Sequence, residues 1–372
     1  MLTKITLDNF KSFKNKTVVD LTKTNYTILP QNVSDNGVLK GCIFVGANAS
    51  GKSTIILAVK LLLDLLFSER NINSGMFLCM FGDTNKYSLS YEFLIENKTI
   101  SYSFEVDVAK KMISESLYID NELLLQRMGL SAKSYIADSN GVNYDEEDVG
   151  KDSLFLRTLY FNTKFASNST LGSWMDCLKK SFYVNMFKGE IVSYGKRDMT
   201  IATYLDNGGC EVINNFFDEY NFEQKVEFVH STSGGKISFV AGEDEDVKTV
   251  FFKRKGIEVP IPFFEESLGN QNLLRILPVF LSAINNGGML LIDEFSSGFH
   301  NELESLLVRY FMEKANHAQM LFVSHSTNLL SNSILRPDQE YSVEFQDQNG
   351  STVRRFSSEQ PRSAQNIEKM YV

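Results

Sequence analysis

Short apolar runs and longer amphipathic stretches alternate along the chain, which predicts both strands and helices. The apolar run 41–45 is typical of a buried strand. The stretch 52–67 is rich in Ile, Leu, Ala and Val and contains no Pro or Gly, so it predicts a long buried helix. Upstream, mixed polar and apolar residues over 2–7 and 17–21 indicate two strands. The chain is therefore expected to open with strands that lead into a strand–loop–helix unit.

The middle of the chain divides into a strand-rich part and a part with weaker patterns. The runs 87–95 and 99–106 predict a β-hairpin, and strand patterns continue to residue 126, which indicates an antiparallel patch. From 127 to 235 we expect a mostly helical insertion. Its amphipathic or helix-like stretches are 171–187, 201–205 and 211–220. Strand composition returns at 225–230, 236–240, 249–252 and 256–261.

The last third has the clearest pattern. Helices are predicted over 270–284 and 302–311, with Pro278 expected to kink the first one. Strands are predicted over 289–292 and 320–323. Alternating strands and helices favour a largely parallel sheet wrapped by helices, which is an α/β fold. The expected domains are an N-terminal lobe over 1–126, the insertion over 127–235 and a C-terminal lobe over 236–372.

The loop between the strand at 41–45 and the following helix fits the pattern G-x-x-x-x-G-K-[ST] of phosphate-binding loops. Glycines let backbone N–H groups turn toward phosphates, and the helix N-terminus favours anions. Lys52 is expected to reach the β- and γ-phosphates of ATP, and the Ser53 hydroxyl to bind Mg²⁺. The predicted nucleotide-contacting residues are Gly46, Ala47, Asn48, Ala49, Ser50, Gly51, Lys52, Ser53 and Thr54.

Carboxylates follow the predicted strand at 289–292. An apolar strand that ends in Asp293 and Glu294 is typical of a Walker B element. Asp293 is expected to hold Mg²⁺, directly or through water, and Glu294 to act as general base toward the attacking water. Two adjacent carboxylates at a strand end can also form a solvated turn, but the phosphate loop favours the ATPase interpretation.

Two further polar positions are candidates. His325 follows the strand at 320–323, and the carboxyl ends of parallel strands share one edge of a sheet, so His325 is expected near the γ-phosphate. The alternative is a histidine that caps a loop. Ser267 and Gly269 precede the helix predicted over 270–284, where they form either a second anion site for a partner's nucleotide or an ordinary N-cap.

Composition and charge indicate the partners and the cellular compartment of the protein. The 372 residues carry a net charge of −9, and the densest basic cluster, Lys253 to Lys255, is more typical of a solvated turn than of a phosphate track. The four cysteines have no paired spacing, which favours a reducing compartment. The chain begins with a strand-like segment that does not resemble a signal peptide, and it has no long uncharged apolar run, so we expect a soluble, cytoplasmic protein with no membrane partner.

The order of these motifs resembles the ABC-type ATPase heads of the SMC and RecF kind. The opening segment Ile5–Phe13 and the form of the phosphate loop carry this resemblance. The chain is more closely similar to ATP-binding proteins of bacterial abortive-infection and anti-phage systems, through Phe299-His300, the segment 324–330 and the segment 335–339. The resemblance implies a P-loop NTPase of ABC/SMC-head type, with the antiparallel patch and the helical insertion added to it.

The resemblance also implies a homodimer that sandwiches two ATP molecules, with Ser267 and Gly269 of one chain facing Lys52 and Ser53 of the other. Two departures leave parts of this picture open. The signature reads Ser-Leu-Gly-Asn instead of Ser-Gly-Gly-Gln, and no Gln lies between 32 and 125 to serve as the usual second magnesium contact. The chain also lacks the sustained heptads of long SMC proteins.

Three functions are compatible with this sequence. The first is an ATP-driven switch that senses a trigger and controls an effector, a nuclease or toxin. The effector is expected to be a separate protein, because the 47 residues after His325 are too few for an appended nuclease domain. The second is a RecF-like DNA-repair or DNA-end-binding ATPase, for which nucleic acid is a partner. The third is a nuclease that uses the acidic run 145–148, although like charges in a row favour a solvated loop.

Overall fold

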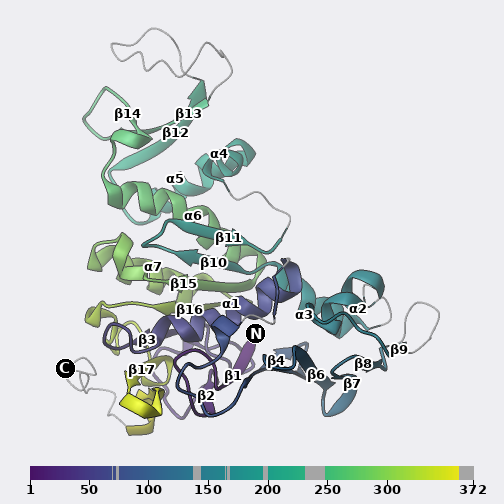
Figure 1. Ribbon diagram of the computed structural model, residues 1–372. Coiled ribbons are helices and arrows are strands. Elements are labelled where there is room, and N and C mark those ends of the chain that lie inside the picture. The colour runs from purple at the N-terminus through teal and green to yellow at the C-terminus, as the bar shows by residue number, and fades with distance from the viewer. Residues whose placement is uncertain are drawn as a thin grey trace. The chain divides into compact units, whose positions relative to one another are not determined.

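The computed structural model describes residues 1–68, 70–72, 75–136, 144–163, 165, 168–195, 200–230 and 248–359 (Figure 1). Contacts within the chain define two compact units. The first comprises Met1–Gly195, Ala283–Ser297 and Asn301–Val372, and the second comprises Lys196–Ser282 and Gly298–His300. These borders differ from the borders expected at 126 and 235. The expected border at 235 and the strand expected over 236–240 lie outside the described residues.

A seven-stranded sheet forms the centre of the first unit, in the order β11-β10-β15-β16-β3-β17-β18. Its strands are β3 (Gly41–Val45), β10 (Phe182–Asn185), β11 (Glu190–Ser193), β15 (Gly288–Asp293), β16 (Ala318–Val323), β17 (Glu340–Phe345) and β18 (Ser351–Arg355). The five strands from β10 to β17 run parallel, and an antiparallel strand closes each edge. All residues of β3, β15 and β16 are buried, as continuous apolar runs predict. The largely parallel sheet is confirmed.

An eight-stranded antiparallel sheet forms a second layer of this unit, in the order β2-β1-β4-β5-β6-β7-β8-β9. Its strands are β1 (Leu2–Asp8), β2 (Thr17–Asp20), β4 (Lys86–Ile95), β5 (Lys98–Asp107), β6 (Met112–Ile119), β7 (Glu122–Met128), β8 (Ser131–Ser134) and β9 (Tyr144–Glu146). The predicted hairpin is confirmed. Glu96 and Asn97 form its two-residue turn with positive φ angles, the geometry that matches the twist of paired strands.

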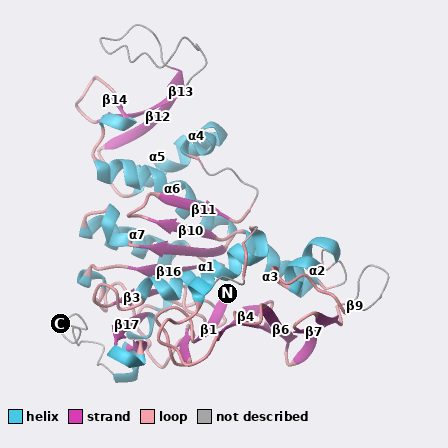
Figure 2. Cartoon of the chain, in the orientation of Figure 1, coloured by secondary structure: helices cyan, strands magenta, loops and turns pink. Residues whose placement is uncertain are grey.

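Helix α1 (Lys52–Phe67) connects the two sheets (Figure 2). It contacts β15 and β16 of the parallel sheet, and its Ala58 carbonyl accepts a hydrogen bond of 2.7 Å from Tyr91 Oη of the antiparallel sheet. Eleven of its sixteen residues are buried, which is expected for a helix that is apolar on all sides. On the parallel sheet, Met312 of α7 (Asn301–Lys314) fills the space beside Gly41.

The region expected to be a helical insertion contains strands as well as helices. α2 (Phe155–Thr163) and α3 (Ser169–Lys179) belong to the first unit. The helix expected over 171–187 ends at Lys179, and residues 182–185 instead form β10. These residues include Phe, Tyr and Val, which favour strands, and they pair with buried β15. Tertiary pairing therefore decides the conformation of this short run.

The second unit contains a three-stranded antiparallel sheet and helices. Its elements are α4 (Ile201–Tyr204), α5 (Cys210–Glu219), β12 (Gln224–His230), β13 (Lys248–Arg254), β14 (Ile261–Pro262) and most of α6 (Leu268–Asn286), which contains Pro278. The strand expected over 256–261 does not form: Gly256 lies in a turn with a φ of 79°, and only Ile261 enters β14. In the described ranges, no helix combines the length and the apolar character needed to cross a membrane.

Candidate nucleotide-binding site

The phosphate loop connects the carboxyl end of β3 to the first turn of α1. Gly46 and Gly51 have φ angles of 156° and 107°. A Cβ atom at Gly46 would lie 2.2 Å from the Val343 carbonyl oxygen, and one at Gly51 would lie 2.4 Å from Ser351 Oγ. Both positions therefore require glycine for conformation and for space. The strands β17 and β18 brace the loop from the side, and Ser351 Oγ donates a hydrogen bond of 2.6 Å to the Ser50 carbonyl.

Lys52 and Ser53 begin α1 and point toward different parts of the site. Lys52 Nζ donates hydrogen bonds to the carbonyl oxygens of Gly46 at 2.9 Å and Ala47 at 2.8 Å, so its ammonium group lies at the loop. Burial lowers the pKa of Lys52, and the carboxylates of Glu294 and Asp293 oppose this shift. The lysine is thus a nearly buried cation held at the glycine loop by two carbonyl oxygens, and a cation at such a loop fits a phosphate group.

Asp293 ends β15 and faces the first turn of α1. Ser53 Oγ donates a hydrogen bond of 2.8 Å to its Oδ1. Burial raises the pKa of Asp293, and the hydrogen bond from Ser53 opposes that rise. A hydroxyl and a carboxylate in contact form an oxygen donor set that suits Mg²⁺, which usually takes one or two carboxylates together with phosphate oxygens. The residues present therefore fit a magnesium–nucleotide complex.

Glu294 and His325 meet at the same edge of the sheet. His325 Nε2 lies 3.3 Å from Glu294 Oε2, and both side chains are partly exposed. Glu294 has a φ of 57°, a strained conformation for a residue with a side chain, and such strain clusters at functional sites. The His325 backbone N–H donates to Ser296 Oγ at 3.1 Å. The first compact unit thus brings together Lys52, Ser53, Asp293, Glu294 and His325.

Asn185 is a site residue that sequence reasoning missed. It ends β10, directly opposite Asp293 in the parallel register, and its Nδ2 donates to Asp293 Oδ2 at 3.3 Å. Its Oδ1 accepts a hydrogen bond of 2.9 Å from the Lys188 backbone N–H and retains a second lone pair. The helix expected over 171–187 concealed this position, because only a strand end would have marked Asn185 as a neighbour of Asp293.

Ser267 and Gly269 belong to the second compact unit, whereas Lys52 belongs to the first. Ser267 Oγ accepts a hydrogen bond of 3.3 Å from the Asn270 backbone N–H, which is the geometry of an N-cap on α6. The Glu266 carboxylate accepts from the Ser267 N–H at 2.9 Å, so two N–H groups at this helix start already have partners. Ser267 is exposed, and a Cβ at Gly269 would meet open space.

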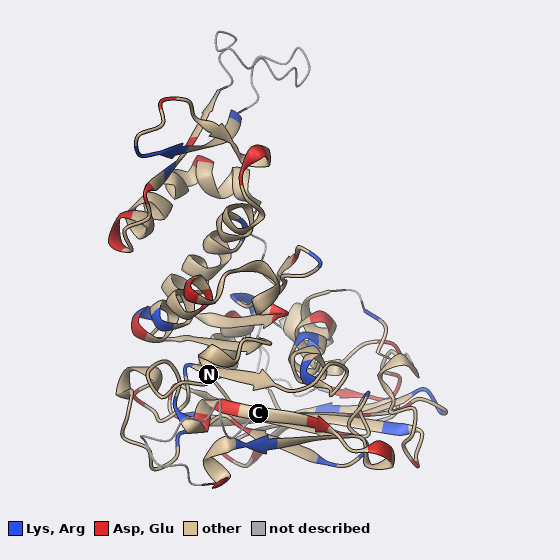
Figure 3. Ribbon diagram, turned by 90° about the vertical axis from the view of Figure 1, so that its left-hand side faces the viewer, with Lys and Arg blue, Asp and Glu red and all other residues tan. Residues whose placement is uncertain are grey.

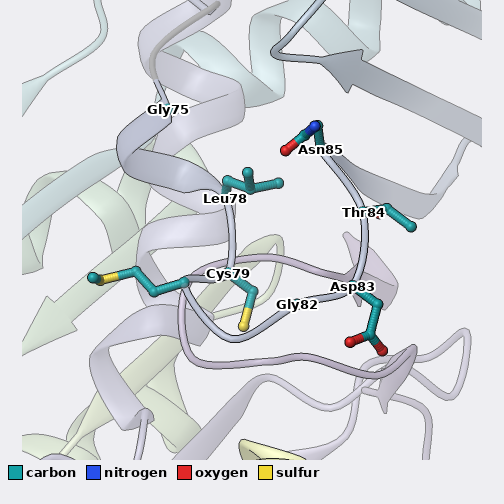
Figure 4. A pocket seen from close by; sticks show the side chains of 8 residues that line it. Gly75, Leu78, Cys79, Gly82, Asp83, Thr84 and Asn85 are labelled. Carbon is teal, nitrogen blue, oxygen red and sulfur yellow. The ribbon is translucent and has the colours of Figure 1, made fainter.

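Other candidate regions show no comparable set of groups. The side chains of the acidic run 145–148 are exposed, and Asp145 pairs with Lys133 at 3.2 Å. A hollow of about 260 Å³ is lined by residues of the 75–85 segment, including Cys79 and Asp83 (Figure 4). It contains none of the phosphate-loop or strand-end residues. Within the described ranges, no group of three or more His, Cys, Asp or Glu side chains is placed to hold a metal by itself.

A phosphate loop between a buried parallel strand and a helix, with a strand-end carboxylate against its serine, defines the class of P-loop nucleotide-binding α/β proteins. The family that matches the sequence is described as "AAA domain, putative AbiEii toxin, Type IV TA system", and the match covers residues 43–331. The chain belongs to this family. The resemblance to abortive-infection ATP-binding proteins is therefore confirmed. No curated protein matches the chain.

Several solved structures are similar to the chain at low identity. One is the SMC head domain from Thermotoga maritima, with 14% identity, a TM-score of 0.49 and coverage of 95% of this chain and 98% of that chain. Another is the Smc head domain with an extended coiled coil, bound to the C-terminal domain of ScpA and derived from Pyrococcus furiosus. It has 12% identity, a TM-score of 0.48 and coverage of 95% of both chains.

Proposed function

We propose that the protein is an ATP-binding and ATP-hydrolysing switch that controls a separate effector. The observation that carries this proposal is the meeting of Ser53 with Asp293, and of Glu294 with His325, at the edge of the sheet where Lys52 lies in the phosphate loop. This set contains a phosphate-binding cation, a magnesium ligand pair and a general base. Membership in an AAA family supports ATP as the ligand.

Each residue has a distinct role in the proposed reaction. When bound, Mg²⁺·ATP supplies the phosphoanhydride bond that water cleaves. Lys52 holds the β- and γ-phosphates, and Ser53 and Asp293 are the protein ligands of Mg²⁺. Asn185 would orient the Asp293 carboxylate toward Mg²⁺ through the hydrogen bond from its Nδ2 to Asp293 Oδ2. Glu294 accepts a proton from the attacking water, and His325 contacts the γ-phosphate and orients Glu294.

The switch is proposed to work as a homodimer that closes over two nucleotides. Ser267 and Gly269 of one chain contact the ATP held by Lys52 of the other. Ser267 is exposed and the space beside Gly269 is open, which supports access of a phosphate group. The N-cap role of Ser267 is compatible with this, because the N–H groups of Leu268 and Gly269 are the ones proposed to face the anion.

The effector is proposed to be a separate nuclease or toxin in an anti-phage system, in the cytoplasm. Support comes from the family description, which names a toxin and a toxin–antitoxin system, and from the site itself, which holds one set of hydrolytic groups. Recovery of a second protein with the chain in a pull-down from its native operon is the expected result. A pull-down that recovers the chain alone would count against a separate effector.

The alternative, a RecF-like DNA-binding ATPase, requires unpaired basic charge. The cluster at 253–255 does not provide unpaired basic charge, because each of its cations has an acidic partner in the same unit. Figure 3 shows basic and acidic residues together around the sheet of β12 and β13. The pairs are Lys253–Glu227 at 3.4 Å, Arg254–Glu266 at 2.7 Å and Lys255–Glu223 at 3.6 Å. ATP turnover that rises with DNA, together with steeply salt-dependent DNA binding, would favour this alternative.

Nucleotide binding and turnover by three proteins test the main proposal. The wild type is expected to hydrolyse ATP. Lys52→Ala removes charge-assisted hydrogen bonds to phosphate and should weaken ATP binding by about 10- to 100-fold. Glu294→Gln keeps the shape but not the base, so it should bind ATP normally, lose about 100-fold or more of its turnover and accumulate as the ATP-bound dimer. Turnover of Glu294→Gln at the native rate would exclude Glu294 as the base.

A further inference from the structure

The residues on both sides of His325 are held from inside the protein. β16 ends at Val323, and Ser324 and Ser326 are 0% and 9% exposed, whereas His325 between them is exposed. Successive side chains of extended backbone point to opposite sides. An anchor on both serines therefore fixes the direction in which the imidazole between them leaves the chain.

The anchor is Glu304, in the first turn of α7. Ser324 Oγ donates a hydrogen bond of 2.5 Å to Glu304 Oε1, and the Ser326 backbone N–H donates to Ser324 Oγ at 3.0 Å. Glu304 is 0% exposed. The carboxyl group thus lies under the backbone that carries His325, on the side opposite the nucleotide site.

The same turn of α7 also holds the rest of this loop. Ser326 Oγ donates to Asn301 Oδ1 at 3.4 Å. Asn328 Nδ2 donates to Ser305 Oγ at 2.9 Å and to the Asn301 carbonyl oxygen at 3.3 Å. α7 begins seven residues after Glu294 in the sequence, so the helix ties the histidine loop to the chain segment that leaves the Walker B strand.

A buried carboxyl group such as Glu304 lowers stability through its desolvation, so stability alone does not explain why it holds the two serines. Burial raises the pKa of Glu304, and the hydrogen bond from Ser324 opposes that rise. In the described part of the chain, no Lys or Arg forms an ion pair with Glu304, and its Oε2 has no hydrogen-bond partner. An apolar side chain of similar volume would avoid this desolvation cost. The carboxyl group therefore contributes direction more than stability.

We infer that Glu304 is a positioning residue for the proposed ATP hydrolysis, acting through Ser324 and Ser326 on His325. The inference rests on the proposed function of the site. Glu304 touches neither the phosphate loop nor the strand-end carboxylates. Its effect on the reaction is to keep the imidazole at Glu294, so its loss lowers turnover without weakening nucleotide binding.

Steady-state ATP turnover in two backgrounds tests this inference. Glu304→Leu should lower kcat by about tenfold and change KM by less than about twofold. Glu304→Gln keeps an acceptor for Ser324 Oγ and should restore kcat to within about threefold of the wild type. In a His325→Ala background, Glu304→Leu should cause no further loss of kcat, because the group that it positions is already absent. Glu302→Leu, an exposed position on the same turn, is the matched control and should keep the native kcat.

Two outcomes would overturn the inference: an unchanged kcat in Glu304→Leu, or an equal loss of kcat in the presence and absence of His325. If Glu304→Leu does not fold, Ser324→Ala removes the same hydrogen bond with a smaller change in volume and should show the same dependence on His325. A loss that persists without His325 would again reject the positioning role.

A readout without ATP separates this inference from the proposed function. The chain has four histidines, so the imidazole NMR signals of His325 can be assigned with the His325→Ala variant. Glu304→Leu should shift or broaden these signals, whereas Glu304→Gln and Glu302→Leu should leave them in place. A wild type that does not hydrolyse ATP would refute the proposed function. Unmoved His325 signals in Glu304→Leu would refute the positioning role.

Discussion

Two buried carboxylates in the first unit, Glu115 and Asp293, differ in how many hydrogen-bond donors the protein provides for them. In the antiparallel sheet, Glu115 accepts hydrogen bonds from Arg127 at 3.1 Å, Tyr102 Oη at 2.9 Å and the backbone N–H groups of Phe155 and Leu156. At the carboxyl end of β15 in the parallel sheet, Asp293 accepts a hydrogen bond from the Ser53 hydroxyl and, at a longer distance, one from the Asn185 amide. We call Glu115 with its donors the closed group, because its hydrogen-bonding capacity is used within the protein. We call Asp293 with its neighbours the open group, because Asp293 retains capacity to bind a cation.

This difference separates structure from function in physical terms. A buried charge with a paired cation and several donors fixes the elements around it, and Glu115 does this by capping the first turn of α2. A strand-end carboxylate with few donors beside a second carboxylate, as at Asp293 and Glu294, gains most from an external cation. A third case is Glu340, which is fully buried, and in the described residues neither of its oxygens has a hydrogen-bond partner.

The closed group should dominate stability. Arg127→Ala would leave Glu115 as an unpaired buried charge and remove hydrogen bonds to the carbonyl oxygens of Gly150 and Ser153. We expect a loss of about 3–5 kcal/mol in the free energy of unfolding. Chemical denaturation measures this loss. Nucleotide affinity, measured below the transition, should change by less than about twofold.

An exposed ion pair in the same antiparallel sheet is the control. Lys86 and Glu105 lie 2.7 Å apart but are 49% and 43% exposed. Lys86→Ala should therefore lower the free energy of unfolding much less than Arg127→Ala does. If Arg127→Ala cost no more than Lys86→Ala, or weakened ATP binding in the folded protein, the separation between the closed and open groups would be wrong.

Substitution of Glu340 should raise the free energy of unfolding, whereas substitution of Arg127 should lower it. Burial raises its pKa well above the ordinary value, and Asp338 adds to the rise. The unfolded chain therefore ionises at a lower pH than the folded chain, and stability falls as the pH rises from the unfolded pKa toward the folded pKa. Glu340→Leu removes this penalty and should raise the free energy of unfolding by about 1–3 kcal/mol at neutral pH.

Denaturation at about pH 5 and about pH 8 measures the pH dependence of this gain, which should be larger at the higher pH. Glu344→Leu, at an exposed position on the same strand, should change stability by about 0.5 kcal/mol or less at both pH values. A Glu340→Leu variant that is equally stabilised at both pH values, or destabilised at both, would show that the Glu340 carboxyl is not buried in its neutral form.

Most of the parallel sheet could be predicted because its strands are continuous apolar runs and its glycine loop has a fixed spacing. The expected helix 52–67 coincides with α1, and the strand 41–45 coincides with β3. β10 could not be predicted, because its three residues with strand preference, Phe182 to Val184, directly follow an amphipathic stretch, and only pairing with β15 marks them as a strand. Local pattern defined long elements, and tertiary contacts defined this short one.

The candidate site shows the same limit. Ser53 lies against Asp293, and Glu294 lies against His325. The groups that support these residues come from positions with no motif, such as Ser351 beside Gly51 and Glu304 beneath His325. The motif-like segment 335–339 supports β3, the strand that leads into the phosphate loop. Arg336 pairs with Asp338 at 2.8 Å, and Gln339 donates a hydrogen bond of 2.7 Å to the carbonyl oxygen of Gly41 in β3. Long-range packing of this kind leaves no periodic trace in the sequence.

Asn185 gives the smallest and most specific test of the open group. Because its amide lies next to Asp293 and is 5% exposed, Asn185→Ala should raise the Mg²⁺ concentration needed for half-maximal ATP turnover by about tenfold. Affinity for ATP without Mg²⁺ should stay within about twofold, because Lys52 and the loop are unaltered. Asn349→Ala, an exposed asparagine of the same unit, should leave both quantities unchanged. An unchanged Mg²⁺ requirement in Asn185→Ala would mean that the amide does not orient Asp293 toward the metal, so Asn185 would have only a structural role.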